Sequence, residues 1–394
     1  MSNLNRRNLL GAVILLIGFG AYVNIQYNTY LFQLRGLSPR QIGWMGALGA
    51  VPSLFTPLLA GWLLDRSPDP RRLLVALSGF AAVAMAALPH LPGSFLSLGI
   101  GFFLMQSVLL PIPSLTTSLL VAKGSSRSQS VFLALRGMGT LGFFLVSFFL
   151  YFWSRQVPLS WVYGILAGVL VVNIPFLWQL KPLSQDCDAP SVPSLRESFA
   201  LLWQPGLLAI YLTGALAYLS VGLGQSLLGN LVTSKEMGGQ SWHINLAWCF
   251  STLPELGFMF LGIPFLRRFG LKSMVLVGIF SNALRWFWVS QATGLPQVYA
   301  SQTLHGIMVV GLMTGQSLCL ARLLPPGRQA SGMAVASILN GGVAGILGSS
   351  IAGWIWQTWS LRAVYGVAGV VLTLSGILFW VFVPSLEAAP APEA

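Results

Sequence analysis

The chain has 394 residues, of which 55% are hydrophobic and only 8% are charged, with a mean hydropathy of +0.76. Soluble domains carry roughly a quarter of their residues as Asp, Glu, Lys or Arg, so this composition excludes a soluble enzyme. Basic residues outnumber acidic residues by 21 to 9. In so apolar a chain we expect this excess to lie in short loops between membrane spans, which argues against a nucleic-acid partner.

The three cysteines, Cys187, Cys249 and Cys319, are too few and too scattered for a disulfide framework or a metal-ligand spacing. We therefore predict no metal site and no cofactor. The first apolar stretch stays uncharged from Asn8 to Leu34, which is longer than the apolar part of a signal peptide. We interpret this stretch as the first membrane helix.

Many runs of the sequence are long enough to cross a membrane, because about 20 apolar residues in a helix span roughly 30 Å of hydrocarbon. These runs are continuously apolar, which favours helices over the alternating strands of a barrel. In chain order the predicted spans are 9–34, 42–64, 73–90, 95–121, 130–153, 159–180, 205–232, 243–266, 273–291, 297–321, 331–356 and 363–384. We expect an all-α integral membrane protein with twelve transmembrane helices.

Lys and Arg are distributed unequally between the alternate connections of these spans. With the N-terminus inside, 14 of the basic residues fall on the inner side and five on the outer side. Basic residues collect in cytoplasmic loops, so we expect both termini in the cytoplasm. A single multi-pass chain without a targeting peptide is typical of a bacterial inner membrane, where we expect this protein.

The longest polar connection separates six predicted spans from six. We expect an N-terminal six-helix bundle at 1–181, a cytoplasmic linker at 182–204, a C-terminal six-helix bundle at 205–386 and a disordered tail at 387–394.

The two halves carry a sign of internal duplication. Gly61 and Gly262 lie 201 residues apart, and so do Arg66 and Arg267. Offsets near half the chain length are typical of transporters built from repeated units. The alternative, that short cytoplasmic loops simply collect arginines, explains the bases but explains the matched glycines less well.

The connection after the second span resembles the Gly-x-Leu-x-Asp-Arg motif of the major facilitator superfamily. The matching residues are Gly61, Leu63, Asp65, Arg66, Arg71 and Arg72. This resemblance implies the major facilitator fold and a cytoplasmic gating motif, in which Asp65 and the basic residues, with Arg267 from the second copy, hold the inner side closed. Leu266 replaces the acid in the second copy, so we expect an asymmetric latch.

The start of the second span is similar to a Gly-Leu-Ser-x-x-x-Ile-Gly signature of one branch of this superfamily, which contains lactose permease, the nucleoside:proton symporters and the phenylpropionate permease. The signature is also sound as a helix start, since Ser38 suits the N-cap, Pro39 the first helical position and Gln41 the capping-box partner. The stretch from Arg136 to Phe143 is similar to a second element of the branch. The resemblance implies a proton-coupled symporter that works by alternating access.

Few ionisable residues lie deep within the predicted spans, where a charge costs at least ~2.5 kcal/mol. The helical rise places Glu255, Arg285 and His305 in one layer between the bundle centre and the outer face. We predict that Glu255 carries the coupled proton, with Arg285 and His305 as its partners. The alternatives are a static Glu255–Arg285 pair that locks helix packing, and a histidine with a packing role.

Arg136 is the counterpart of a buried arginine of lactose permease, but the acid that pairs with it there is absent from residues 113–118. Met308 stands where the proton-carrying glutamate of that permease would be. The resemblance therefore implies a substrate other than lactose, and Arg136 is available for an anion.

The candidate substrate-binding residues combine one cation with aromatic and amide side chains: Arg136, Phe143, Tyr22, Tyr27, Trp248 and Asn282. Such a set suits an aromatic carboxylate, a nucleoside or a sugar. Alternatively, the aromatic residues face lipid or pack helices together. Gln225 and Asn282 are polar residues that either bind the solute or join helices.

The preferred function is proton-driven symport of a small organic solute, and the main alternative is a multidrug or metabolite efflux antiporter of the same superfamily. Such antiporters carry a Gly-Pro-x-x-Gly element in the fifth helix, whereas residues 136–153 contain no proline. A sensor would need a soluble output domain, and an enzyme would need paired carboxylates or a nucleophile motif, which we do not find. The expected partners are a small solute, a proton and the lipid bilayer, and we expect a monomer.

Overall fold

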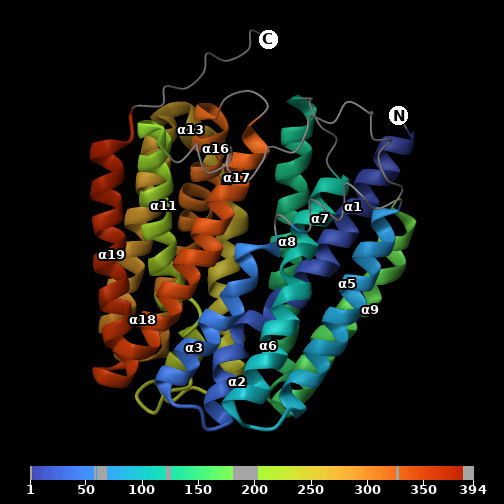
Figure 1. The fold of residues 1–394 in the computed structure, drawn as a ribbon, viewed down its shortest axis with the longest axis vertical. Coiled ribbons are helices and arrows are strands. Elements are labelled where there is room, and N and C mark those ends of the chain that lie inside the picture. Colours follow the sequence, from blue (N-terminus) through green and yellow to red (C-terminus); the bar gives the residue numbers. More distant parts are fainter. Residues whose placement is uncertain are drawn as a thin grey trace.

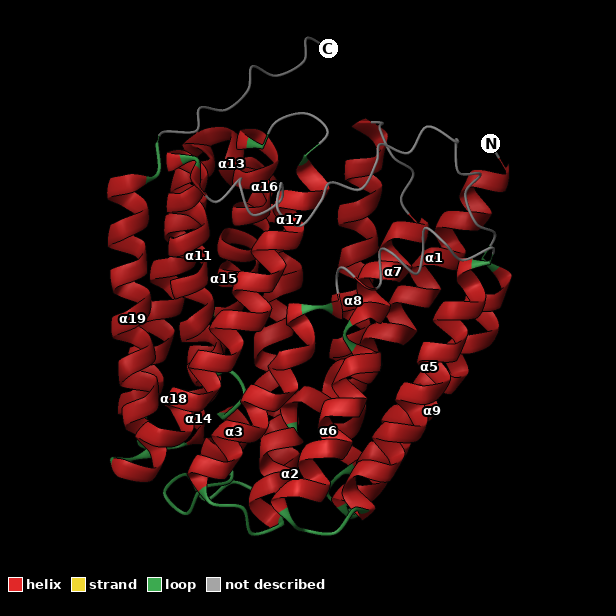
Figure 2. Ribbon diagram, in the orientation of Figure 1, coloured by secondary structure: helices red, strands yellow, loops and turns green. Residues whose placement is uncertain are grey.

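The computed structural model describes residues 2–56, 59, 69–120, 126–180, 203–324 and 328–384. These residues form helices joined by short loops, and there is no strand among them (Figure 2). The side chains of some helical positions, residues 2–8 and 126–136 among them, are not described.

The helices of the first half of the chain gather on one side of the molecule, blue to green in Figure 1. They are α1 (Ser2–Gly20), η1 (Ala21–Gln26), α2 (Asn28–Leu34), α3 (Pro39–Ala50), η2 (Val51–Leu54), α5 (Pro70–Ala87), η3 (Leu88–His90), α6 (Phe95–Leu109), α7 (Pro111–Leu120), α8 (Ser126–Trp153) and α9 (Leu159–Gln179).

The helices of the second half lie beside them, green to red in Figure 1. They are α11 (Pro205–Gly224), α12 (Leu228–Val232), α13 (Ser241–Gln291), α14 (Leu295–Gln302), α15 (His305–Met308), α16 (Gly315–Leu323), α17 (Gln329–Ser337), α18 (Ala344–Thr358) and α19 (Leu361–Phe382), with π-helical segments η5 (Val309–Thr314) and η6 (Ile338–Val343).

The described helices follow the predicted spans in order, and several spans consist of consecutive helical pieces. Among the described residues, eight stretches are long and apolar enough to cross a membrane by length and composition.

Helix α13 covers two predicted spans in one element, because the chain stays helical up to a break at Gly270. This residue has φ of 79°, which an L side chain rarely adopts, and glycine therefore permits the sharp turn between the spans.

The predicted start of the second span is confirmed. The Ser38 side chain accepts a hydrogen bond from the Gln41 backbone N–H at 3.3 Å, and the Gln41 side chain accepts one from the Ser38 N–H at 2.9 Å. Pro39 occupies the first helical position, where a missing N–H costs nothing. The chain therefore enters α3 at a fixed point at the end of the molecule opposite the start of α1 (Figure 1).

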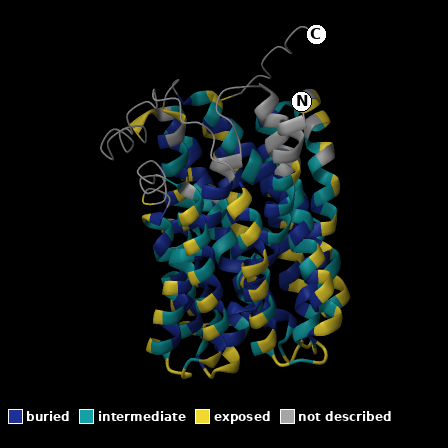
Figure 3. Ribbon diagram, turned by 90° about the vertical axis from the view of Figure 1, so that its right-hand side faces the viewer, coloured by how far each residue is buried: buried dark blue, intermediate teal, exposed yellow. Residues whose placement is uncertain are grey.

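The two sets of helices meet along α3 against α18 and along α8 against α13. Glycine allows the first of these contacts, since a Cβ built on Gly43 would lie 2.6 Å from the Gly353 Cα atom. Helices approach this closely only where the facing residues are small. Apolar side chains fill the interior, while exposed positions follow the outer faces of the helices (Figure 3).

Candidate functional site

Glu255 lies in α13 at a point where two features of the sequence shape the backbone. Pro254 precedes it inside the helix and removes a backbone donor. Gly306 packs directly against it from α15, since a Cβ on Gly306 would lie 2.6 Å from the Glu255 Cα and N atoms. The glycine therefore brings α15, and with it His305, against the carboxylate-bearing turn of α13.

The Glu255 carboxylate reaches across to the other half of the chain. Its Oε1 atom accepts a hydrogen bond from the Thr140 hydroxyl of α8 at 2.9 Å. The residue is 7% exposed, so the carboxylate lies in a region of low dielectric where each polar contact matters more than it does in water. The hydrogen bond between α8 and α13 therefore depends on whether the Glu255 carboxylate is ionised.

Arg285 is fully buried within the second half and is surrounded by neutral side chains. Its Nη1 atom donates to Gln225 Oε1 at 3.1 Å and to Asn282 Oδ1 at 3.2 Å, and its Nη2 atom donates to Gln302 Oε1. Its guanidinium also lies over the Trp286 ring, 4.1 Å from the ring centroid. Amide dipoles and the face of an aromatic ring therefore stabilise the positive charge of Arg285 in the interior.

His305 is the third neighbour of the Arg285 Nη1 atom, with its Nδ1 atom 3.1 Å away. A guanidinium can only donate, so the Nδ1 atom of the imidazole accepts, and the ring is neutral with its proton on Nε2. The Trp248 ring packs edge-on against this imidazole, with centroids 6.0 Å apart. Protonation of His305 would require its bond to Arg285 to break.

The predicted cluster of Glu255, Arg285 and His305 is therefore only partly brought together. Arg285 bonds to His305, but the ion pairs between described side chains do not include one between Glu255 and Arg285. Among the described contacts, the arginine donates to the amides of Gln225 and Gln302, and the carboxylate accepts from Thr140.

The candidate substrate residues fall into different surroundings. Phe143 of α8 and Trp248 of α13 contact each other between the two halves, with centroids 5.5 Å apart. Tyr22 donates to the Leu109 carbonyl at 2.6 Å, and Tyr27 is completely buried. Asn282 belongs to the Arg285 network. Arg136 is part of α8, but its side chain lies outside the described residues.

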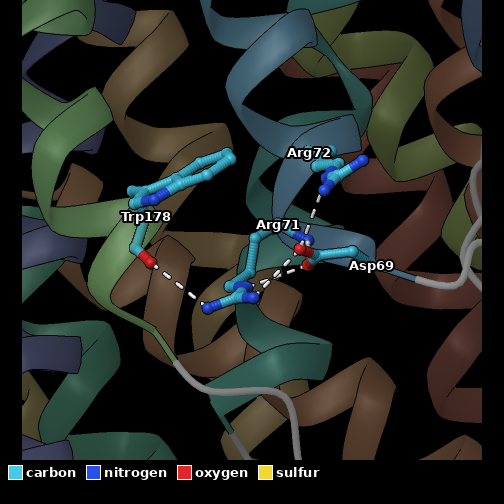
Figure 4. A network of polar contacts seen from close by, with 4 residues as sticks. All are labelled: Asp69, Arg71, Arg72 and Trp178. Atoms are coloured by element: carbon cyan, nitrogen blue, oxygen red, sulfur yellow. Dashed lines mark hydrogen bonds and ion pairs between the residues drawn. The ribbon is translucent and has the colours of Figure 1, made fainter.

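The gating motif is described only in part, because Gly61, Asp65 and Arg66 and the side chain of Arg267 lie outside the described residues. Arg71 and Arg72 of the motif are described, and they share one acidic partner. Both bind Asp69, with Arg71 Nε at 2.8 Å and Arg72 Nε at 3.7 Å from its carboxylate oxygens (Figure 4).

Asp69 also caps the start of α5, accepting from the Arg71 backbone N–H at 3.1 Å. Hydrogen bonding to Arg71 holds the pKa of this carboxyl below its ordinary value. The Arg71 guanidinium also donates to the Trp178 carbonyl at 3.5 Å, which ties α5 to the end of α9 (Figure 4).

The end of the molecule opposite the start of α1 is closed by contacts between the two halves. The Thr29 hydroxyl donates to the Ser226 carbonyl, and the Asn230 amide donates to the Thr29 carbonyl at 3.1 Å. Beside them, the Asn245 amide donates to the Ser154 hydroxyl at 3.1 Å. Arg155 stacks on Trp242, 4.2 Å from the ring centroid. This seam uses neutral hydrogen bonds and a cation–π contact.

Thr140 and Gln302 are two members of the site that sequence reasoning did not single out. Gln302 accepts from Arg285 and from the Ser251 hydroxyl at 3.3 Å. The available signal was a polar side chain inside an apolar span, but threonine and glutamine in such spans also join helices. Among the described residues there is no group of three His, Cys, Asp or Glu side chains that could hold a metal ion.

Comparison with known proteins gives consistent relatives over nearly the whole length. Residues 13–367 match the family described as "MFS_1 like family". The maltose permease of Geobacillus stearothermophilus is 24% identical over 383 residues, which cover 96% of this chain and 94% of that protein.

Two solved structures share the fold at low sequence identity. The nucleoside transporter NupG superposes with a TM-score of 0.79 at 15% identity, covering 95% of this chain and 98% of that one. A D-xylose-proton symporter superposes with a TM-score of 0.73 at 16% identity, covering 96% and 97%. These matches confirm the predicted all-helical, multi-span fold of the major facilitator type, and they imply twelve membrane helices.

Proposed function

The chain belongs to the MFS_1 like family, and from this premise we propose that it is a symporter that couples the movement of a small organic solute to that of a proton. At the level of the family it is a multi-pass membrane protein and a secondary transporter of small solutes, not an enzyme. The coupling ion, the direction of transport and the solute class are the proposed parts.

The observation that carries the proposal is the contact between Glu255 and Thr140. A carboxylate buried between α8 and α13 changes its charge most readily when the two helices separate and water enters. Alternating access requires such a separation. Protonation of Glu255 is therefore linked to the same movement that exposes the solute, with Arg285 and His305 as neighbouring parts of the polar site.

The proposed solute lies between Phe143, Trp248 and His305, where aromatic rings from the two halves meet a neutral imidazole. Aromatic faces with a few polar groups suit a sugar, a nucleoside or an aromatic carboxylate. The names of the relatives, a maltose permease, a nucleoside transporter and a D-xylose-proton symporter, support the first two classes. Arg136 in α8 is the proposed anion-binding residue if the solute carries a carboxylate.

The orientation and division of the chain are proposed with the function. Helix α1 begins and α19 ends at the same end of the molecule (Figure 1), and the bias of 14 basic residues against five supports a cytoplasmic location for that end. We assign 1–181 and 205–386 to the two six-helix bundles. On this orientation, the seam around Thr29 and Asn230 closes the outside.

The test is uptake into proteoliposomes under an imposed proton gradient, with maltose, D-xylose, uridine and benzoate as the first solutes. Glu255→Gln removes the titratable group and keeps the shape. We expect it to lose gradient-driven accumulation while solute exchange continues. The matched control is Glu236→Gln, which alters an exposed acid that pairs with Arg362. Unchanged accumulation in Glu255→Gln would contradict the proposal.

A further inference from the structure

Arg285 carries a full charge into the interior of the second half, and no acid among the described residues pairs with it. It is completely buried, and its side-chain partners are Gln225, Asn282, Gln302 and His305. The ion pairs between described side chains leave it out. Neutral dipoles compensate a buried cation less completely than a counter-ion does, because both the charge and its partners give up hydration.

The hydrogen bonds of Arg285 are concentrated on one part of the guanidinium. Three acceptors, Gln225, Asn282 and His305, crowd around Nη1. On the other edge, Nη2 donates to Gln302, and Nε has no hydrogen-bond partner among the described residues. The Nε and Nη2 edge is one of the forks that bind a carboxylate through two parallel hydrogen bonds. The edge suited to a bidentate anion is therefore the one left underused.

Other donors without an acceptor lie around the same arginine. Asn282 Nδ2, Trp286 Nε1 and the Tyr365 hydroxyl are all buried and have no hydrogen-bond partner. Trp286 stacks on the guanidinium, and the Tyr365 ring lies 5.4 Å from the Trp286 ring. Buried donors that have no acceptor favour a ligand that supplies one, and an anion supplies acceptors best.

Two of the acceptors stand at interruptions of their helices. Gln225 follows α11, which ends at Gly224 before α12 begins at Leu228. Gln302 ends α14, and α15 begins at His305. Side chains at such breaks move with less disruption than those within a continuous helix, because fewer backbone hydrogen bonds hold them. They provide a route by which a ligand replaces an amide.

We infer that Arg285 binds a carboxylate carried by the transported solute, on its Nε and Nη2 edge and in place of Gln302. The inference rests on the proposed transport function and narrows its solute class to organic carboxylates. On this inference the anion-binding residue is Arg285 of the second half instead of Arg136 of the first half. In the present conformation the amide oxygens of Gln225 and Gln302 bond to the guanidinium, and the anion would displace the second of them.

The test is the thermal midpoint of the full-length protein in nanodiscs, without any gradient. Sodium acetate, benzoate and gluconate are titrated at constant ionic strength, against chloride and against acetamide, benzamide and glucose. We expect at least one of the three carboxylates to raise the midpoint saturably, with no such effect of the uncharged compounds. A response to none of the three carboxylates, or an equal response to chloride, would overturn the inference.

Variants assign the effect to the arginine. In Arg285→Gln we expect the apparent affinity for the carboxylate to fall about tenfold or more, as expected for loss of a charged hydrogen-bond partner. Arg40→Gln is the matched control, because Arg40 lies over Trp44 near the start of α3. An undiminished response in Arg285→Gln would place the anion elsewhere and reject the assignment.

A second substitution keeps the test valid if Arg285→Gln does not fold. Gln302→Glu is nearly isosteric and places a fixed carboxylate against Nη2. We expect this variant to have a higher midpoint than the wild type and to lose the response to added carboxylates. A retained response would count against the site.

Glu255→Gln, measured both by thermal midpoint with added carboxylates and by uptake into proteoliposomes under a proton gradient, separates the two proposals. If it loses proton coupling but retains the carboxylate response, both proposals stand. Proton coupling that survives in Glu255→Gln rejects the proposed function alone. A carboxylate response that survives in Arg285→Gln rejects the inference alone.

Discussion

Thr29 and Asn230 are 201 residues apart in the sequence and touch in space, with the Asn230 amide donating to the Thr29 carbonyl at 3.1 Å. The same separation relates Gly61 to Gly262 and Arg66 to Arg267. Two positions related by a two-fold repeat lie on opposite sides of the symmetry axis, so they can touch only close to that axis. If the predicted duplication relates the two halves, this contact between α2 and α12 lies close to their pseudo-symmetry axis.

Contacts between the two halves close this end of the molecule, and Asn230 makes two of them. Its amide also donates to Gln33 Oε1 at 2.7 Å. Asn230→Ala removes both hydrogen bonds, at about 1 kcal/mol each. We expect the closed seam to open more often, because removing bonds that exist only in the closed state shifts a two-state equilibrium toward the open state.

The measurement is labelling of a cysteine introduced as Ser226→Cys, in a background with the native cysteines replaced, by a membrane-impermeant maleimide added from outside. Asn230→Ala should label faster than its parent. Thr373→Val is the control, because the Thr373 hydroxyl bonds within its own helix to the Gly369 carbonyl. Equal labelling rates in Asn230→Ala and its parent would show that this bond does not hold the seam.

Glycine-to-alanine substitution is expected to have opposite effects at the contact of α3 with α18 and at an open position of α9. In Gly353→Ala the added methyl group meets the Gly43 Cα atom at 2.6 Å, so we expect a loss of about 1–3 kcal/mol of stability. At Gly168 of α9 an added methyl group would have no neighbouring atom within 4 Å, and alanine there removes the helix penalty of glycine. We expect Gly168→Ala to match or exceed the wild-type midpoint in thermal unfolding. A neutral Gly353→Ala would mean that the helices separate without cost.

Much of the fold follows from local patterns, whereas the partners within the site do not. The spans come from runs of apolar residues, and the start of α3 comes from Ser38 and Gln41, three residues apart. Thr140 and Glu255 are 115 residues apart and meet only through the packing of α8 on α13. No period or motif in one sequence encodes such a pairing.

Arg71 illustrates the same limit at short range. The family motif directs attention to Asp65, which lies outside the described residues, whereas the described partner of Arg71 is Asp69. Local geometry at the start of α5 decides the partner, because Asp69 caps the helix and meets the arginine two residues later. A motif derived from other chains does not carry that information.

The Thr140 hydroxyl bond predicts a change in the pH dependence of uptake. In Thr140→Val the Glu255 carboxylate loses its hydrogen bond from α8. We expect the pH profile of proton-driven uptake to differ from that of the wild type, with Thr140→Ser restoring the original profile. The initial rate of uptake as a function of external pH measures this. A profile that is the same in all three proteins would remove Thr140 from the coupling site.

Asp69 predicts a pH-dependent contribution to the stability of α5. Because hydrogen bonding to Arg71 lowers the pKa of Asp69 below its ordinary value, its contribution is fully present above that ordinary value, about pH 4. The contribution is lost as the pH falls through the lowered pKa. Asp69→Asn should therefore have a lower thermal midpoint than the wild type at neutral pH, by an amount that is constant down to about pH 5 and disappears in stronger acid.

Glu236→Gln, which changes an exposed acid, controls for the loss of a negative charge. A difference between wild type and Asp69→Asn that persists unchanged into strong acid, where the aspartate is protonated, would show that the negative charge of Asp69 is not its cause.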